Sequence, residues 1–479
     1  MKAIAKNNIF KIIVLLICVA LFLTVCATVS DVRDRNGNKI TFDDIQYFEG
    51  QVAVIGDYLY YANSYTSSSD ENFDYDTAAS TGYLNRINLS SISYDYTADE
   101  DGYVNPSPIG SEMVNDRFVG FENQYMFALG EYLYFTSVNT HRTTGLENDY
   151  SQVSLFRVKF NGDKFDEIET FRYDENSIIT AQKGDDGNYY YIVYCPADSE
   201  ATSYNLYSIK IGSKIGDTTL LAEEVTSVAI CDEDSQFRNV LFTTAAENEY
   251  YETTAIKEVN FATGEVSNYS NGLETLGSTT TFMGRFGDIV VYSYSSNITP
   301  QSIFYKDLAN DDKLFNGGNE FYPSHSNITL YGRAGDGYLF LSETSGSLMY
   351  KPTLGMNSTA EEGYVDPTPI ALLTSDSFSD ILFVDGDYVY YSNSTSISRI
   401  SVRDRVEQQL VSMTSIVSGE CGYDGNYIYF YAQLEEQESD TDEEEDSDST
   451  ETATDENYYL YRVNKTGYLQ LLSKVEKPE

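Results

Sequence analysis

Short hydrophobic runs alternate with polar turns along most of the chain after about residue 50. The phrase "GDYVYYSN" begins at residue 386, and "SISRISV" follows it from residue 396. Relatives of the first phrase begin at residues 56, 130, 187, 238, 287, 336 and 425. Alternating aromatic and β-branched residues between Gly, Asp and Asn clusters are typical of β-hairpins. The pattern therefore predicts one hairpin repeated along the chain.

Each repeat contains four short apolar runs. An apolar run such as "VAVI" at 52 precedes the aromatic phrase, a basic-aromatic run such as "YLYRVNK" at 459 follows it, and "LQLLSK" at 469 is typical of the last run. A single four-stranded meander cannot bury both of its faces, whereas copies packed radially bury them and leave only short edges. We therefore expect an all-β fold, a single β-propeller of about eight four-stranded blades over residues 47–474. Seven blades is the alternative, because the copy at 238 lacks its glycine, and residues 30–46 would be a linker or a closing strand.

The first 29 residues predict an apolar leader helix that is a signal peptide or a membrane or lipoprotein anchor. Lysines precede an uncharged apolar run at residues 12–29, which is long enough to span a membrane. Three fates remain open: cleavage after Ala27, retention as an anchor, and acylation of Cys26, since "LTVC" resembles a bacterial lipobox apart from its Val. Each fate places the rest of the chain outside the cytoplasm. We expect it on the outer face of the cell membrane, with free secretion as the alternative.

The chain is strongly acidic, with 75 Asp and Glu against 30 Lys and Arg. A net charge of −45 disfavours nucleic acid and anionic lipid as partners, so membrane contact is expected through the N-terminus only. Residues 435–456 carry many carboxylates and no large apolar side chain, which predicts a disordered acidic insertion within the last blade. This insertion and the polar loops at 64–80 and 96–112 are where the sequence directs a search for a binding surface.

Catalytic and metal-binding motifs are scarce. The two histidines, His141 and His325, lie in polar segments expected to form loops. The sequence has no nucleophile-elbow motif, no Cys and His spacing typical of a zinc site, and no phosphate-binding loop. We expect no cofactor. Calcium at the Asp-rich turns near residues 185, 232 and 385 is the alternative, although turns need Asp and Gly without any metal.

Three cysteines remain outside the leader, too few for a disulfide framework. We expect them to be buried apolar residues, with one disulfide among them left open. They are Cys195, Cys231 and Cys421.

A basic residue recurs in the third run of nearly every repeat. We expect these blade cations to pair with a carboxylate of the same or the next blade and so to fix the register. A ring of cations that binds an anionic glycan is the alternative. The positions are Arg86, Arg157, Lys257, Lys306, Lys351, Arg399 and Arg462, with the four arginines as the principal candidates.

Units such as "GDYVYYSN…SISRISV" and "GNYIYFYA…YLYRVNKTGYLQLLS" resemble the low-density-lipoprotein-receptor-like β-propeller repeats of bacterial exported proteins of unknown function. The resemblance extends over all eight units. It implies a propeller and an exported location, but no activity. Animal receptor propellers of this kind carry Tyr-Trp-Thr-Asp in the aromatic strand, and this chain has no Trp, so their ligands cannot be carried over.

The expected function is non-enzymatic binding of a protein, peptide or glycan of the cell envelope by a monomer. One alternative is a carbohydrate-active enzyme that uses Asp and Glu at the central opening. A second alternative is a structural component of an envelope assembly.

Overall fold

The computed structural model describes most of the chain between residues 31 and 474. The residues it leaves undescribed are 1–30, 35, 51, 63–80, 92–110, 121–125, 140–148, 213, 232–237, 247–252, 270–277, 297–300, 310–314, 316–318, 323–327, 353–367, 414, 417–420, 434–457 and 475–479. The predicted leader helix, Cys26 and the acidic insertion at 435–456 lie outside the described residues. No helix within the described part of the chain is long and apolar enough to cross a membrane.

The described residues are arranged almost entirely in β-strands, which group into eight four-stranded antiparallel blades. Blade 1 consists of β2 (Ala53–Ile55), β3 (Tyr58–Ala62), β4 (Thr81–Asn88) and β5 (Ser111–Gly120). Blade 2 consists of β6 (Met126–Gly130), β7 (Tyr132–Asn139), β8 (Asp149–Lys159) and β9 (Asp166–Arg172). Blade 3 consists of β10 (Ile178–Lys183), β11 (Tyr189–Pro196), β12 (Tyr204–Ile211) and the first part of β13 (Thr218–Ala229). Blade 4 consists of the end of β13, β14 (Val240–Ala246), β15 (Thr253–Asn260) and β16 (Glu265–Asn268).

The second half of the chain continues the series. Blade 5 consists of β17 (Thr279–Phe286), β18 (Ile289–Ser295), β19 (Ser302–Asp307) and β20 (Asn319–Tyr322). Blade 6 consists of β21 (Ile328–Ala334), β22 (Gly337–Ser342), β23 (Ser347–Pro352) and β24 (Ile370–Thr374). Blade 7 consists of β25 (Asp380–Asp385), β26 (Tyr388–Asn393), β27 (Ser396–Ser401) and β28 (Glu407–Ser412). Blade 8 consists of β29 (Gly422–Tyr423), β30 (Tyr427–Gln433), β31 (Tyr458–Asn464) and β32 (Leu469–Lys474), and two short 3-10 turns lie at Leu89–Ser91 and Ser375–Ser377.

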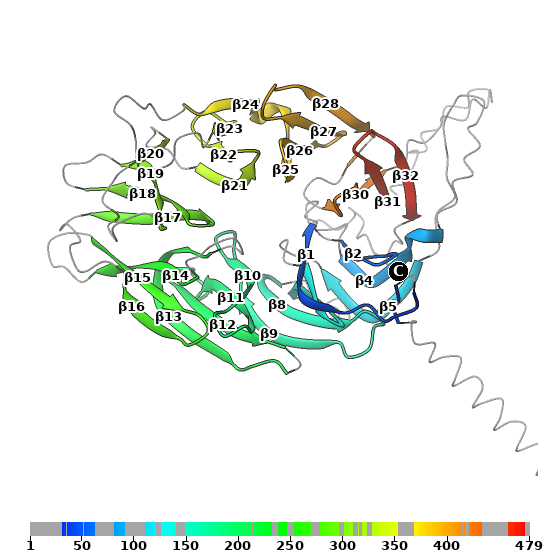
Figure 1. Cartoon of the computed structure of the whole chain (residues 1–479), viewed down its shortest axis with the longest axis horizontal. Coiled ribbons are helices and arrows are strands. Elements are labelled where there is room, and N and C mark those ends of the chain that lie inside the picture. The colour runs from blue at the N-terminus through cyan, green and yellow to red at the C-terminus, as the bar shows by residue number, and fades with distance from the viewer. Residues whose placement is uncertain are drawn as a thin grey trace, which may run out of the picture.

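The blades follow one another around a ring in chain order (Figure 1). Each aromatic phrase of the sequence forms the second strand of a blade, and each basic-aromatic phrase forms the third. The phrase at residue 238 also forms a strand, β14, although it lacks the glycine, so the described residues contain eight blades and not seven. The predicted all-β propeller is confirmed.

Alternating side chains of the second strands fill the spaces between blades. In β26, Tyr390 packs with residues of blade 8, whereas the next residue, Tyr391, packs with residues of blade 6. Successive side chains of a strand point to opposite faces, so a continuous aromatic run buries both faces of a blade. The tyrosine-rich phrases therefore provide the packing between neighbouring blades.

One further strand, which belongs to none of the eight blades, closes the ring. The strand β1 (Phe42–Gly50) pairs antiparallel with β6 of blade 2 and with β29 of blade 8, so it bridges across blade 1. Gly50, at φ +81°, faces Gly422, and a Cβ on Gly50 would lie 1.7 Å from the carbonyl oxygen of Cys421. Only glycine permits this close approach. Blades 1 and 8 also pack directly, since Tyr61 and Tyr431 share one apolar cluster.

Candidate functional site

The four blade arginines occupy one repeated environment. Each guanidinium lies over the first tyrosine of the neighbouring second strand, within cation–π distance of its ring. The distances from guanidinium carbon to ring centroid are 4.3 Å for Arg86 on Tyr58, 4.6 Å for Arg157 on Tyr132, 4.4 Å for Arg399 on Tyr388 and 4.1 Å for Arg462 on Tyr427.

Two of these arginines link their own blade to the next one. Arg86, which is fully buried, donates from Nε to Glu112 of its own blade at 2.9 Å and from Nη1 to the carbonyl oxygen of Phe160 in blade 2 at 3.3 Å. Arg157 repeats the arrangement with Asp166 in its own blade and the carbonyl oxygen of Gly212 in blade 3, both at 2.9 Å. Because each arginine holds two blades at once, it can fix both the sheet register and the angle between the blades.

At the other two positions the partner is an amide and not the expected carboxylate. Arg399 donates to Gln408 Oε1 at 2.8 Å, and Arg462 donates to Gln470 Oε1 at 2.7 Å. An amide oxygen accepts the same hydrogen bonds without a second charge to desolvate. Arg86, Arg157 and Arg462 are buried, so a ring of exposed cations for an anionic glycan is not formed by these side chains.

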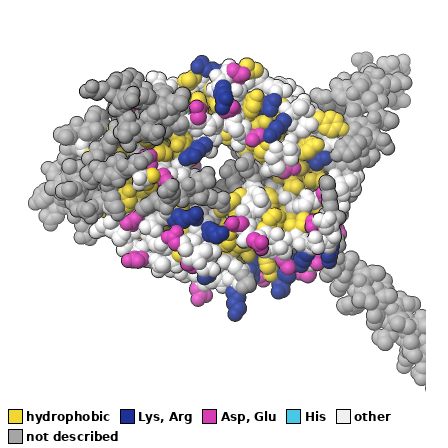
Figure 2. Space-filling view, in the orientation of Figure 1, with side chains coloured by type: hydrophobic (Ala, Val, Ile, Leu, Met, Phe, Trp, Pro, Cys, Tyr) yellow, Lys and Arg dark blue, Asp and Glu magenta, His cyan; other side chains and the backbone are white. Residues whose placement is uncertain are grey.

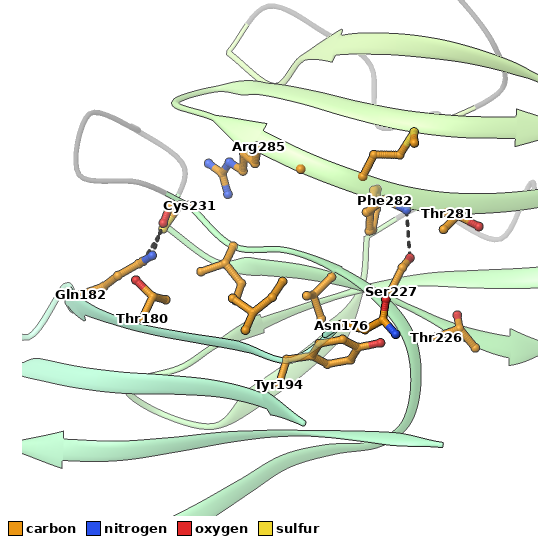
Figure 3. Close-up of a pocket in the computed structure, with 15 residues that line it drawn as sticks. Asn176, Thr180, Gln182, Tyr194, Thr226, Ser227, Cys231, Thr281, Phe282 and Arg285 are labelled. Atoms are coloured by element: carbon orange, nitrogen blue, oxygen red, sulfur yellow. Dashed lines mark hydrogen bonds between the residues drawn. The ribbon is translucent and has the colours of Figure 1, made fainter. Parts of the chain in front are cut away.

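A pocket of about 440 Å³ lies where the first strands of blades 3, 4 and 5 approach one another (Figure 3). Strand β10 contributes Ile178, Thr180 and Gln182, β13 contributes Thr226 to Val228, and β17 contributes Thr281 to Arg285. The sequence alone does not reveal this pocket, because its residues come from three repeats and form no contiguous motif.

One end of the pocket is held by hydrogen bonds between blades 3 and 4. The Gln182 amide nitrogen donates to the carbonyl oxygen of Cys231, and the Cys231 thiol donates to Gln182 Oε1 at 2.9 Å. Beside them, Arg285 donates from Nε to the carbonyl oxygen of Gly287 at 2.7 Å and from Nη1 to that of Asn239 at 3.2 Å. These bonds fix the side chains at this end of the pocket, and Asp288, whose Oδ1 lies 3.8 Å from Arg285 Nη2, partners the positive charge there.

Further along the pocket, several polar side chains are left available to a ligand. Tyr194 is 6% exposed, its ring stacks on Tyr204 at 4.8 Å between centroids, and its hydroxyl has no hydrogen-bond partner among the described residues. Burial raises the pKa of Tyr194 above its ordinary value, so the hydroxyl keeps its proton and remains a donor. The hydroxyls of Thr180 and Thr281 likewise have no partner within the described part. A small polar ligand could satisfy all three groups.

The pocket is free of negative charge although the chain is strongly acidic. Among the described residues that line it, none is Asp or Glu, and Arg285 is the one charged residue. No Asp or Glu is buried anywhere in the described part of the chain. The described carboxyl groups with shifted pKa values are all shifted downward, which suits stable anions and not general acids. They are Asp34, Glu131, Asp186, Asp198, Asp385 and Asp404.

The other residues singled out from the sequence are placed as follows. His141, His325 and the polar loops at 64–80 and 96–110 lie outside the described residues. Within the described ranges no three His, Cys, Asp or Glu side chains are grouped to hold a metal ion. Cys195, Cys231 and Cys421 are buried free thiols.

No protein-family model matches the chain, and no curated protein matches it. Among solved structures, the chain is similar to a prolyl endopeptidase (TM-score 0.41, 10% identity, 81% of this chain and 55% of that chain) and to the Dos1 propeller (TM-score 0.39, 10% identity, 81% of this chain and 92% of that chain). It is also similar to TolB from Acinetobacter baumannii (TM-score 0.27, 11% identity, 70% of this chain and 67% of that chain). This chain spans only about half the length of the endopeptidase. The assignment as a propeller rests on the strand order and the ring of this chain.

Proposed function

We propose that this protein is an extracytoplasmic, membrane-tethered β-propeller that binds a protein, peptide or glycan without chemical conversion, in the pocket between blades 3, 4 and 5. The proposed location and tether rest on the leader sequence at 1–29. The proposed binding rests on one observation above all. Tyr194 lines a pocket of about 440 Å³, and its hydroxyl makes no hydrogen bond within the described residues. A ligand in the pocket could accept a hydrogen bond from this hydroxyl in place of water.

The composition of the pocket supports a binding site for a neutral or anionic group. Apolar side chains such as Val228 and Met283 alternate with hydroxyl and amide groups, as in sites that bury a ligand and orient it with a few polar contacts. No carboxylate lines the pocket in the described part, so a cationic group would find no counter-charge there.

The test is a pull-down with the full-length protein in detergent, against cell-wall glycans and envelope extract. The same experiment is run with Thr281→Tyr, since Thr281 is exposed and a larger side chain there fills the pocket without disturbing the core. Thr219→Tyr is the matched control, because Thr219 is exposed on the outer part of β13, away from the pocket. Capture that is lost in Thr281→Tyr and kept in Thr219→Tyr is the expected result.

Two results would contradict the proposal. Equal capture by both variants would place the binding surface elsewhere. Release of new reducing ends from the glycans would show the carbohydrate-active enzyme instead.

A further inference from the structure

The chain already contains one extended segment bound on inner strands of the propeller. Residues Gln46, Tyr47 and Phe48 of β1 pair with Ala128, Phe127 and Met126 of β6, and the end of β1 pairs with β29. Neither pairing belongs to the four-stranded meander of a blade. The free edges of two first strands are therefore able to accept an added strand, which is the physical basis of peptide recognition by β-strand addition.

The side chains of β1 also reach beyond the strand on which it lies. The Tyr47 ring packs on Phe127 at 6.1 Å between centroids, and its hydroxyl donates to the carbonyl oxygen of Ala181 on β10 of blade 3. One added strand thus contacts two consecutive blades, through its main chain on one and through an aromatic side chain on the other.

Corresponding edges are unpaired on the opposite side of the ring. Strands β21 and β25 are the first strands of blades 6 and 7, and in the described residues each pairs on one side only. Both lie on the inner side of their blades (Figure 1). An unpaired edge presents a row of main-chain donors and acceptors to an incoming strand.

Strand β21 is the more accessible and lies next to the pocket. Its residues Thr329, Tyr331 and Arg333 are exposed, with Tyr331 38% exposed. On its other side, Leu330 lies against Gly284 of the pocket, and Arg333 donates to the carbonyl oxygen of Phe286 at 3.1 Å. Figure 2 shows several Lys and Arg side chains, with Asp and Glu side chains near them, on one part of the rim of the hollow at the centre of the ring.

We infer that the ligand of the pocket is an extended peptide that pairs through its main chain with the free edge of β21, as β1 pairs with β6. The inference rests on the proposed function. Side chains on one face of the peptide recur about every 6.6 Å, so one of them enters the neighbouring pocket. That side chain is neutral or acidic, because no carboxylate lines the described pocket, Arg285 is already paired with Asp288, and Arg333 is exposed beside it. A glycan could use the threonine hydroxyls but would leave the strand edge unpaired.

The probe is a synthetic peptide with the sequence of β1, FDDIQYFEG, labelled at its N-terminus. It is titrated against the full-length protein at 150 mM salt, which screens the repulsion between two acidic molecules. A version with alternate amides N-methylated keeps every side chain but removes the main-chain donors of one edge. Hydrogen exchange with mass spectrometry then locates the peptide, and we expect protection of residues 328–334. At a peptide concentration ten times Kd, the exchange of the covered amides should slow about tenfold.

A protein variant checks the position independently. Tyr331→Ala should weaken peptide binding about two- to fivefold through loss of one cross-strand aromatic contact. Tyr468→Ala is the matched control, since Tyr468 is 40% exposed in blade 8, and it should leave binding unchanged.

Each of the other outcomes would overturn one part of the inference. Slower hydrogen exchange at β6 together with faster exchange at β1 would show that the peptide displaces the native strand β1. That result would overturn the proposed site on β21. Equal binding of the N-methylated peptide would overturn main-chain pairing. If oligosaccharides bind in a manner sensitive to Thr281→Tyr while the peptide does not bind, the peptide inference fails and the proposed function stands. If neither probe binds and the pull-down of the preceding section is also negative, both fail.

Discussion

The hydroxyl of Tyr431 in blade 8 donates to the carbonyl oxygen of Ala62 in blade 1 at 3.2 Å, and so joins two residues at opposite ends of the propeller sequence. Both residues are fully buried. No strand of blade 1 is hydrogen-bonded to a strand of blade 8. The ring is therefore closed by side-chain contacts such as this one and by β1, which pairs with β29.

Tyr431→Phe tests this contact. The change removes the hydroxyl, leaves the carbonyl of Ala62 buried and keeps the ring in place. We expect a loss of about 1 kcal/mol in the free energy of unfolding, measured by urea denaturation. Tyr388→Phe is the control, because Tyr388 is 38% exposed, and it should change stability by less than about 0.5 kcal/mol. Equal effects would show that the contact between the two blades contributes nothing.

Gly50→Ala tests the closing strand. The new Cβ would lie 1.7 Å from the carbonyl oxygen of Cys421, so β1 and β29 must separate. Gly37→Ala is a matched control, since Gly37 has φ +82° and nothing within 4 Å of its Cβ position. Both variants should lose about 1 kcal/mol from the left-handed backbone, and Gly50→Ala should lose a further ~2 kcal/mol or more from overpacking. Melting temperatures compared side by side would show the difference, and equal values would contradict the close approach.

The repeated hairpins could be predicted from the sequence, because the residues that specify each hairpin are close together in the chain. A glycine turn such as Gly386 (φ +58°) and the alternating aromatic run that follows it specify strand, turn and two buried faces within about ten residues. Even the irregular copy at 238 keeps apolar residues at the buried positions Val240 and Phe242, which is why it forms a strand without the glycine.

The sequence left residues 30–46 open between a linker and a closing strand, and neither the extent of β1 nor the pocket could be predicted, because both depend on long-range register. Strand β29 has only two residues, and β1 carries exposed Asp43 and Asp44, so neither shows a strand pattern. The pocket combines Thr180, Thr226 and Thr281, which lie about 50 residues apart and are common residues in any hairpin. The resemblance to exported receptor-like propellers remains a prediction beyond the propeller fold itself.

Substitution of the blade arginines should give graded effects. Arg86→Met removes a fully buried guanidinium that bonds Glu112 and the Phe160 carbonyl, and leaves that carbonyl without this donor. We expect a loss of about 2 kcal/mol, less than for a fully buried ion pair because Glu112 is half exposed. Arg399→Met should cost about 1 kcal/mol, since Arg399 is only partly buried and bonds a neutral amide.

Urea denaturation of both variants, with binding of the ligand measured in parallel, distinguishes the two roles considered for these residues. Lower stability with the dissociation constant unchanged supports a structural role. Unchanged stability with lost binding would show that the arginines form a ligand site.

The pair of Asp385 in blade 7 and Lys465 in blade 8 predicts a stability change in acid. The Lys465 ammonium bonds Asp385 Oδ2, and Tyr423 donates to the same oxygen at 3.0 Å. The hydrogen bond from Lys465, followed by that from Tyr423 and the charge of Lys465, holds the pKa of Asp385 below its usual range. A carboxyl group with a lowered folded-state pKa stabilises the fold above its unfolded value, near 4, and this contribution is lost as the pH falls through the folded pKa.

The difference in unfolding free energy between the wild type and Asp385→Asn should therefore be constant between pH 5 and 8 and should shrink below about pH 4. Both side chains are 38% exposed, so solvent screening limits the contribution to about 1 kcal/mol or less. The pKa of Lys465 is raised mainly by the same hydrogen bond, so its part of the stabilisation is lost only above its unfolded value of about 10.4. Lys465→Met should remove most of the acid-dependent term, and the double variant should add little to either single one. Additive effects of the two substitutions would show that the pair does not couple blades 7 and 8.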